Sequence, residues 1–470
     1  MKFQVINPAT EEVIAELEAL DKKAVSLAVK KARKAFDSWG NTDFDERETI
    51  IKKFGELLSK NKSEIAKLIS REMGKAIIEA EGELEGSLGD INWLLSEARA
   101  ALKDEELKVD VPDIKASIRF EPVGVVGLIT PWNFPFGTAL WKIIPALLTG
   151  NTIVFKPSEL STLCGMKIAD LFNQAGLPEG VFNIVIGDAI TGRHLVKSKV
   201  NMISFTGSTK AGRAILSKAG KGLKKTVMEL GGSDPFIVFE DAQLEQAVNA
   251  AVFGRYLNCG QVCTAAKRIF IQEKIYDAFL QSFVDKVKKL RSGNPLDRKT
   301  EIGPIVSRKQ LLALEVQVND AISKGAKVLC GGKRIQGKGF FFEPTVLTGI
   351  KKNMLVLNEE VFGPVASIIP FKSVKQAIKL ANNIKYGLGA SVWTQNKQTA
   401  EEMINAIESG MIWVNDFGTP YPQCPQGGIK ESGLGREMSI YGIKEFCNMK
   451  SVVVSEDKTI RKPWWFPYGD

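Results

Sequence analysis

Between residues 123 and 231, short apolar runs alternate with helix-like segments, and this alternation limits what the chain can fold into more than any other feature. The β-rich runs are VGVVGLI, TIVF, FNIVI, MISF and TVMEL, each bounded by glycine, proline or polar residues. The segments between them include TALWKIIPALLTG, TLCGMKIADLFNQAG and TKAGRAILSKAG. We therefore predict parallel strands joined by crossover helices, a doubly wound α/β sheet that binds a nucleotide at the carboxyl ends of its strands.

The full length of 470 residues allows two or three domains. A second segment, roughly 232–431, again mixes strand-like and helix-like runs, and the glycines of MELGGSDPFIVF mark the crossing into it. Near the N-terminus, residues 21–40 predict a helix with Asp21 as its N-cap. The tail after residue 450 begins β-rich and ends in aromatic residues, so we expect it to pack on another subunit.

Composition excludes several classes of protein. No apolar run reaches the ~18 residues that span a bilayer, and the N-terminus turns polar at once, so we expect a cytoplasmic protein without a membrane partner. The net charge is +9, but Lys and Glu alternate along helical stretches, which favours mixed solvated faces over a nucleic-acid surface. Six cysteines without a CxxC pair, and one histidine, indicate neither a disulfide scaffold nor a metal site.

The stretch NCGQVCTA places Cys263 among small residues and makes it a candidate nucleophile. A free thiol has a pKa of about 8.5, so this cysteine needs a base, a helix N-terminus or a cation nearby. The single histidine, His194, lies in a surface-like helical run, and Glu229 of MELGG is the better candidate base. For the cysteine alone, a small buried apolar side chain is the competing interpretation.

Other stretches carry weaker signals of binding. TPWNFPFG holds Asn133 between two prolines, where its amide could donate to an oxyanion, although a structural turn explains the pattern equally well. ISFTGSTKAGRAIL places Gly207 and Ser208 in a strand–turn–helix that suits phosphate, but it matches neither a P-loop nor GxGxxG, and an ordinary βα turn remains open. TIVFKPSE ends a strand with Lys156 and Glu159, which suits a ribose contact or a surface loop.

Seven motifs, PWNFP, KPSE, FTGST, MELGG, GQVCTA, EEVFGPV and GGIKESGLGRE, follow one another along nearly the whole chain. In these motifs and their order the sequence resembles the NAD(P)-dependent aldehyde dehydrogenase superfamily, in its hydrolytic, non-acylating branch. Glu229 and Cys263 are 34 residues apart, as the base and nucleophile of that family are.

The resemblance implies a division into a Rossmann-like cofactor domain, an α/β catalytic domain and a small β arm for oligomerisation. The expected ranges are 1–103 and 123–231 for the cofactor domain, 232–431 for the catalytic domain, and 104–122 with 450–470 for the arm. A homodimer or homotetramer is then expected.

The resemblance also implies the chemistry. Cys263 attacks an aldehyde, and the oxyanion is held by the Asn133 amide and the backbone N–H of Cys263. Hydride leaves to the nicotinamide, and Glu229 activates the water that hydrolyses the resulting thioester to a carboxylic acid. Lys142 supports proton traffic, and no histidine is required.

For the cofactor, the resemblance implies a groove formed by residues from several motifs. These are Thr130, Trp132, Lys156, Ser158, Glu159, Gly187, Gly207, Ser208, Leu230, Glu360 and Phe362. Glu159 repels a 2′-phosphate, which favours NAD, although NADP remains possible.

The substrate is less constrained. Trp141 and Leu257 occupy positions at which succinate-semialdehyde dehydrogenases carry arginine, so the pocket lacks the cations expected for a second carboxylate. The expected pocket residues are Phe136, Trp141, Leu257, Val262, Thr264, Phe417 and Tyr421. We expect a small neutral or hydroxy-aldehyde such as glyceraldehyde or lactaldehyde, with hydrogen bonds from Thr264, Asp416 and Thr419. The alternatives are a succinate-semialdehyde or coenzyme-A-acylating semialdehyde dehydrogenase and, from another class, a non-catalytic binding protein on the same fold.

Overall fold

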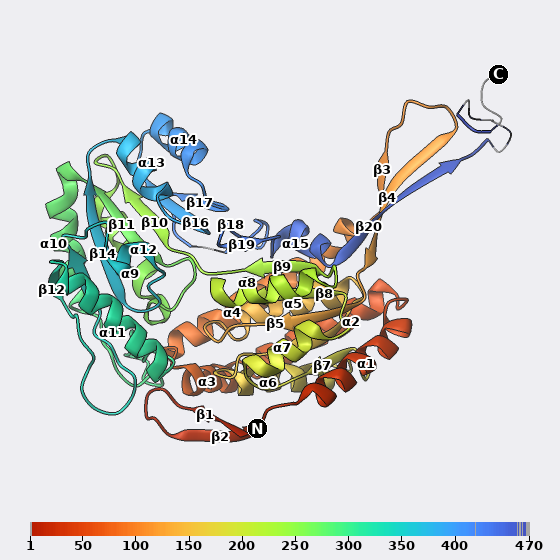
Figure 1. Cartoon of the computed structure of the whole chain (residues 1–470), viewed down its shortest axis with the longest axis horizontal. Coiled ribbons are helices and arrows are strands. Elements are labelled where there is room, and N and C mark those ends of the chain that lie inside the picture. Colours follow the sequence, from red (N-terminus) through yellow and green to blue (C-terminus); the bar gives the residue numbers. More distant parts are fainter. Residues whose placement is uncertain (1, 419, 458, 460–461, 463, 467–470) are drawn as a thin grey trace.

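The computed structural model describes all residues of the chain except 1, 419, 458, 460–461, 463 and 467–470. Among the described residues, two large sheets lie beside each other, each covered by helices, and a narrow antiparallel arm extends away from both (Figure 1). An N-terminal hairpin of β1 (Lys2–Ile6) and β2 (Val13–Glu18) precedes them. The expected mixed α/β class is confirmed.

The first sheet has the strand order β19-β9-β8-β5-β6-β7. Its strands are β5 (Val125–Ile129), β6 (Thr152–Lys156), β7 (Phe182–Ile184), β8 (Met202–Thr206), β9 (Lys225–Glu229) and β19 (Gly433–Leu434). Neighbours from β9 to β7 pair in parallel, whereas β19 joins β9 in the antiparallel sense. The apolar runs singled out in the sequence are these parallel strands, so the predicted doubly wound sheet is confirmed.

Helices cover both faces of the first sheet. Alternate side chains of each strand point to opposite faces, so they are buried in two separate cores. Val126 of β5 joins the core beneath α2–α6, whereas Val125 joins the core beneath α1, α7 and α8. Helix α1 begins directly after Asp21, whose side chain accepts a hydrogen bond from the Ala24 N–H, as predicted. These helices are α1 (Lys22–Trp39), α2 (Phe44–Lys60), α3 (Lys62–Met73), α4 (Ile77–Ala101), α5 (Gly137–Leu148), α6 (Thr162–Gln174), α7 (Ala189–Lys197) and α8 (Thr209–Gly220).

The second sheet has the order β12-β13-β14-β11-β10-β16-β17 and is parallel except for β12. Its strands are β10 (Asp234–Val238), β11 (Ala266–Gln272), β12 (Lys327–Cys330), β13 (Thr345–Thr348), β14 (Val365–Phe371), β16 (Gly389–Trp393) and β17 (Met411–Val414). Phe236 of β10 packs with one layer of helices and Ile237 with the other. The first layer is α9 (Leu244–Tyr256), α10 (Tyr276–Val287) and α11 (Arg308–Ser323), and the second is α13 (Val374–Asn382) and α14 (Lys397–Ala406).

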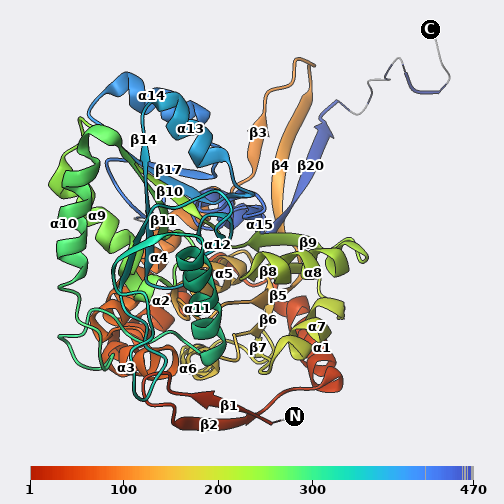
Figure 2. The ribbon, with the colours of Figure 1, turned by 60° about the vertical axis from the view of Figure 1, so that its left-hand side comes forward.

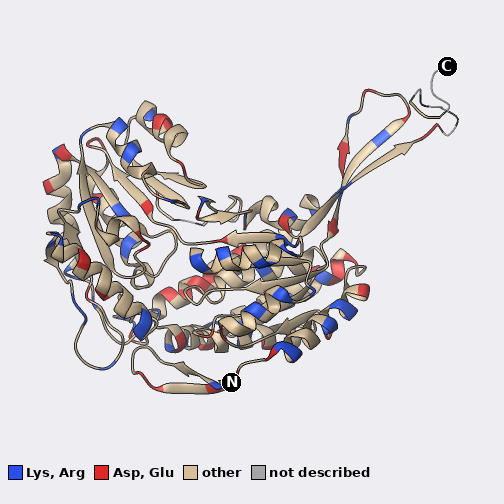
Figure 3. Cartoon of the chain, viewed as in Figure 1, with Lys and Arg blue, Asp and Glu red and all other residues tan. Residues whose placement is uncertain are grey.

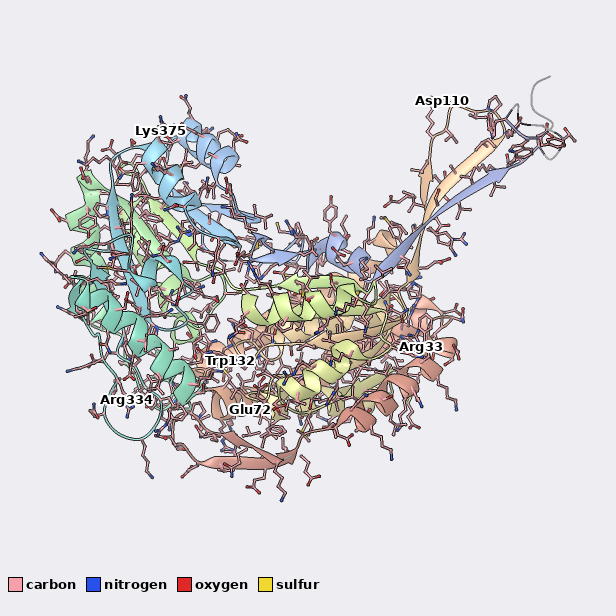
Figure 4. All side chains as sticks on the ribbon, viewed as in Figure 1. Arg33, Glu72, Asp110, Trp132, Arg334 and Lys375 are labelled. Carbon is pink, nitrogen blue, oxygen red and sulfur yellow. The ribbon has the colours of Figure 1, made fainter. Side chains whose placement is uncertain are left out.

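The arm consists of β3 (Glu105–Leu107), β4 (Ile114–Pro122) and β20 (Cys447–Ser455). Strand β20 pairs with the whole of β4, and the arm projects well clear of the sheets (Figure 2). Asp110 lies near its tip (Figure 4). The predicted arm began at residue 450, so β20 starts three residues earlier. Some of the aromatic tail lies outside the described residues.

The segment 432–449, which the sequence prediction assigned to no domain, returns to the first sheet. Its strand β19 pairs with β9, and its helix α15 (Ser439–Glu445) packs on α4 and α5. The N–H of Leu230, just after β9, donates to the Ser432 carbonyl at 2.8 Å. The end of β9 is therefore covered by a segment that lies about 200 residues later in the sequence.

Positions of Lys and Arg are interspersed with those of Asp and Glu along the helices in the ribbon of Figure 3. No helix in the described part of the chain is long and apolar enough to cross a membrane.

Candidate active site

A cavity of about 810 Å³ lies between the two sheets. Its wall is formed by the β5–α5 loop, the β8–α8 turn, the chain after β9, the loop after α9, and one face of α4. Trp132, from the β5–α5 loop, is seen in Figure 4 at the junction between the two halves. Residues from distant parts of the sequence therefore meet here.

Most of the residues predicted for the site line this cavity. These are Trp132, Asn133, Trp141, Gly207, Ser208, Leu230, Leu257, Val262, Cys263, Thr264, Glu360, Phe362 and Phe417. Glu229 and Lys142 lie buried behind the wall. Thr130, Lys156, Ser158, Glu159 and Gly187 follow the carboxyl ends of β5, β6 and β7, outside the cavity.

Two predicted pocket residues are not among the described residues that line the cavity. Phe136 is fully buried in the core beneath α2–α6, because its backbone at the start of α5 is held against α4 by a hydrogen bond from its N–H to Glu83. Tyr421 is 49% exposed and its hydroxyl lies 3.3 Å from Oδ2 of Asp416. Thr419, expected to supply a hydrogen bond, lies outside the described residues.

Cys263 follows a strained turn at the end of α9. Asn258 and Cys259 have φ values of +50° and +55°, a region that L-residues adopt only when the surroundings hold them there. The Asn258 N–H donates to both carboxylate oxygens of Glu79 at 3.1 Å, and its side-chain amide donates to the Asn133 carbonyl at 2.9 Å. The turn is thus fixed by contacts to α4 and to the β5–α5 loop.

Burial raises the pKa of the Cys263 thiol to about 12, and the nearby Lys267 ammonium opposes that rise. Desolvation penalises the thiolate more than the thiol, so the resting site favours the protonated sulfur. Asn133 is 5% exposed, and its amide nitrogen donates to the Gln261 carbonyl at 2.9 Å, which fixes the amide beside the nucleophile. His194 lies on α7 and is not among the described cavity residues.

Glu229 is the last residue of β9 and is 5% exposed. Its Oε1 has no hydrogen-bond partner among the described residues and packs against Gly427, where a Cβ would lie 2.6 Å from it. Burial and the neighbouring Glu437 carboxylate raise its pKa well above the usual range, while Lys142 opposes the rise. The surroundings of Glu229 therefore favour its protonated form in the resting site.

Lys142 and Glu437 form a buried ion pair beside Glu229. The Lys142 ammonium also donates to Oγ1 of Thr206, at 2.6 Å, which is on the cavity wall. Lys142 and Glu437 are 295 positions apart, and sequence reasoning did not identify Glu437. The available signal was its place in the motif GGIKESGLGRE, whose last residue it is.

At the end of the cavity beside the α8 N-terminus, glycines allow other parts of the chain to pack closely. Ser208 caps α8, accepting from the Ala211 N–H at 3.3 Å. A Cβ at Gly212 would clash with Leu230, and one at Gly231 would clash with the Glu360 carboxylate. Glu360 accepts from the Gly232 N–H at 3.1 Å. Trp132 and Phe362 meet edge to face, with ring centroids 5.5 Å apart.

The opposite end of the cavity is aromatic and acidic. The Trp141 indole N–H donates to Asp90 at 2.7 Å, and Phe417 packs where a side chain at Gly254 would clash. Sequence reasoning missed the contribution of α4 and several aromatic residues, because nothing in their local pattern shows that they face a cavity. The missed lining residues include Glu79, Glu83, Asp90, Phe253, Gly254 and Trp413.

Comparison with known proteins agrees with this arrangement. The model of the aldehyde dehydrogenase family matches residues 1–452. The chain belongs to the aldehyde dehydrogenase family. It is 38% identical to a betaine aldehyde dehydrogenase of Bacillus subtilis over 95% of this chain and 93% of that one. It is 39% identical to a mitochondrial succinate-semialdehyde dehydrogenase of Arabidopsis thaliana, over 97% of this chain and 86% of the relative.

Solved structures show the same fold. An NAD-dependent aldehyde dehydrogenase from Sinorhizobium meliloti superposes with a TM-score of 0.96 at 36% identity, covering 99% of this chain and 93% of that one. An NADP-dependent enzyme from Escherichia coli gives 0.94 at 34% identity, covering 97% and 95%. The present chain is thus an NAD(P)-dependent aldehyde dehydrogenase.

The residues present fit a dinucleotide. Gly207 lets the β8–α8 turn lie close to the Phe205 ring, which a Cβ would approach to 2.5 Å, and the first turn of α8 offers backbone N–H groups to a pyrophosphate. Lys156 is buried, donates to the Pro157 carbonyl at 2.8 Å and lies 3.7 Å from the Glu159 carboxylate, which is 44% exposed. Burial lowers the Lys156 pKa, and Glu159 opposes this.

The raised pKa of Cys263 predicts an unusual alkylation profile. The thiolate fraction rises about tenfold per pH unit below the pKa, so the iodoacetamide reaction rate at Cys263 should keep rising through pH 10 in the cofactor-free enzyme. The rate is measured by mass spectrometry of the peptide that carries Cys263, with Cys263→Ala as the blank. A plateau near pH ~8.5, as for a free thiol, would show that burial does not raise the pKa of Cys263.

Proposed function

We propose that this enzyme oxidises a small neutral or hydroxy-aldehyde, of the glyceraldehyde or lactaldehyde kind, to its carboxylic acid, with Cys263 as nucleophile and Glu229 as base. The observation that carries the proposal is that Cys263 and Asn133 line one cavity and that Glu229 is buried next to the lining residue Leu230, near enough for its charge to raise the pKa of the Cys263 thiol. A binding protein on this fold would not need a nucleophile, an oxyanion donor and a carboxyl base at one cavity.

Glu229, once ionised, takes the proton of the Cys263 thiol, the sulfur adds to the carbonyl carbon, and the former carbonyl oxygen becomes an oxyanion. Glu229 gives this proton up past Lys142 and Thr206 before the second step. The Asn133 amide has one N–H committed to Gln261, and we assign its second N–H, with the Cys263 backbone N–H, to this oxyanion. A bound nicotinamide supplies the hydride acceptor that turns the thiohemiacetal into a thioester. Water then attacks the thioester, and the thiol is released with the acid.

Glu229 takes the proton of that water once its carboxyl group is ionised. Its side chain is packed against Gly427 in the resting site, so it must turn toward the cavity to reach the thioester. The neighbouring Lys142 favours the ionised form and Glu437 disfavours it, so this buried ion pair sets the proton affinity of the base. Lys142 also contacts Thr206 on the cavity wall. Through these two side chains the proton can pass from Glu229 to the cavity.

The charges around the cavity support the substrate class. Apart from the Cys263 thiol, the ionisable side chains among its described lining residues are carboxylates, namely Glu79, Glu83, Asp90 and Glu360. No Lys or Arg of the described chain is among those lining residues, so a second carboxylate on the substrate would lose its hydration without gaining a cation. Aromatic rings such as those of Trp141 and Phe417 suit a small, partly apolar substrate instead.

NAD is the favoured cofactor in this proposal. The Glu159 carboxylate lies beside Lys156 at the end of β6, where a 2′-phosphate on the adenosine ribose would meet its negative charge. Ribose hydroxyls, by contrast, donate to such a carboxylate.

The decisive test combines cofactor reduction with an aldehyde panel. Wild type should turn over steadily with glyceraldehyde or lactaldehyde and NAD, and only weakly with succinate semialdehyde. Cys263→Ala should be inactive because no thiohemiacetal forms. Glu229→Gln should give a single burst of NADH, because the thioester forms but is hydrolysed slowly.

Betaine aldehyde and NADP are included in the same panel, because a cationic substrate would also tolerate the acidic lining. Preference for succinate semialdehyde would contradict the proposed substrate class. Steady activity in Cys263→Ala would contradict the mechanism itself, and the absence of turnover with every aldehyde would return the chain to the binding-protein alternative.

Glu437→Gln tests the control of the base. Removing this negative charge, and freeing Lys142 to face Glu229, should lower the pKa of Glu229 and move the rising limb of deacylation to lower pH by about one unit. The enzyme is acylated with 4-nitrophenyl acetate, and hydrolysis of the thioester is followed from pH 6 to 10. Glu445→Gln is the matched control, because Glu445 has a smaller effect in the same direction. An unchanged or higher pH midpoint of deacylation in Glu437→Gln would show that Glu437 does not raise the pKa of the base.

The arm leads us to propose a homodimer or homotetramer. Strand β20 is an edge strand with exposed apolar side chains, Met449 at 74% and Val453 at 64%. Val453→Glu should shift the oligomer toward the monomer in light scattering, because it places a charge on the paired edge. An unchanged mass would show that the arm is not the subunit contact.

A further inference from the structure

Lys267 is a buried cation directly behind the nucleophile. It lies in β11, four residues after Cys263, and its side chain is 0% exposed. Its ammonium donates to the Val262 carbonyl at 2.9 Å and to the Cys263 carbonyl at 2.6 Å. An ammonium loses strong hydration on burial. This cost of desolvation must be offset by hydrogen bonds and by nearby groups of opposite charge.

The same ammonium reaches the cofactor end of the cavity. It lies 3.7 Å from Oε1 of Glu360, the oxygen that also accepts the Gly232 N–H. Burial lowers the pKa of Lys267, while Glu360 and Asp234 raise it. Lys267 therefore bridges the Val262 and Cys263 carbonyls and the carboxylate of Glu360, which the resemblance places in the cofactor groove.

Arg255 joins the same two loops a short distance away. Its guanidinium donates to the Gly260 carbonyl at 2.9 Å on the nucleophile side and to the Val361 and Gly363 carbonyls on the other. Arg255 touches only backbone at these points, whereas Lys267 contacts the Glu360 side chain itself. Of Arg255 and Lys267, Lys267 is thus the cation that contacts both the Glu360 carboxylate and the Cys263 backbone.

We propose that Lys267 is a positioning residue that holds the Cys263 loop at a fixed distance from Glu360 and supplies the positive charge that makes the sulfur reactive. This rests on the proposed function, which makes Cys263 the nucleophile, and on the place of Glu360 in the expected cofactor groove. The approach of Glu360 to the same ammonium links the electrostatics of the thiol to those of the cofactor site.

The electrostatic part has a definite sign. The Lys267 charge lowers the pKa of the Cys263 thiol, and the Glu360 and Asp234 charges raise it. Removing the lysine should therefore slow alkylation at a fixed pH below the thiol pKa, and neutralising Glu360 should accelerate it. A structural defect alone does not produce opposite effects at these two positions.

The test is the alkylation rate of Cys263 by iodoacetamide, measured from pH 7 to 10 on the full-length enzyme, with NAD affinity by calorimetry. Lys267→Met should lower the rate at pH 8 at least about threefold and weaken NAD binding by a similar factor. Lys267→Arg should restore part of both. Glu360→Gln should raise the alkylation rate while weakening NAD binding.

Arg268→Met is the matched control. Arg268 is equally buried on the adjacent position of β11, but it donates to the carbonyls of Ser233, Leu380 and Ala381 on the other face of the strand. It should lower the melting temperature and leave the Cys263 alkylation profile unchanged.

A wild-type alkylation profile and wild-type NAD affinity in folded Lys267→Met would overturn the proposal. Where that variant does not fold, an unchanged or slower alkylation rate in Glu360→Gln overturns it instead. Alkylation needs neither aldehyde nor turnover, so failure of the aldehyde panel and failure of the Lys267 proposal are separate results.

Discussion

The geometry of the site depends on how short the first connection between the two sheets is. Strand β9 ends at Glu229 and β10 begins at Asp234, so this first crossing consists of Leu230 to Ser233 alone, and the chain returns only between β17 and β19. Glycines at 231 and 232 make this possible, because a Cβ at the first would clash with Glu360 and one at the second would lie 2.9 Å from the Cys263 carbonyl. A crossing this short forces the strand ends of both sheets to face a shared cavity.

Charge within this cavity is controlled by burial and by pairing. Glu229, Cys263 and Glu360 are all pushed toward their neutral forms by desolvation, and each is opposed by a nearby cation. Lys142 is the cation beside Glu229, and Lys267 serves the other two. In such a medium a single charge acts more strongly than it would in water. In the proposed mechanism, Lys267 and Lys142 therefore offset part of the desolvation of Cys263 and Glu229 without a nearby histidine.

The sequence was sufficient for the parallel strands and for helix α1, because these depend on local periodicity and capping. It also placed Cys263, Asn133 and Glu360 on the cavity through the order of the motifs. It was wrong about Phe136, since its pattern of prolines and aromatics could not show that α5 turns this ring into the helical core. The contacts made by Glu79, Lys267 and Glu437 could not be predicted, because each joins segments that only the folded chain brings together.

The return of the C-terminal segment has a consequence for synthesis of the protein. The parallel strands of the first sheet are complete in sequence by residue 229, but β19, α15 and the Glu437 carboxylate are supplied only after residue 432. During translation the first domain can begin to fold while its last strand and the partner of Lys142 are still missing. The nascent chain therefore carries Cys263 and Glu229 well before the Lys142–Glu437 ion pair beside Glu229 can form.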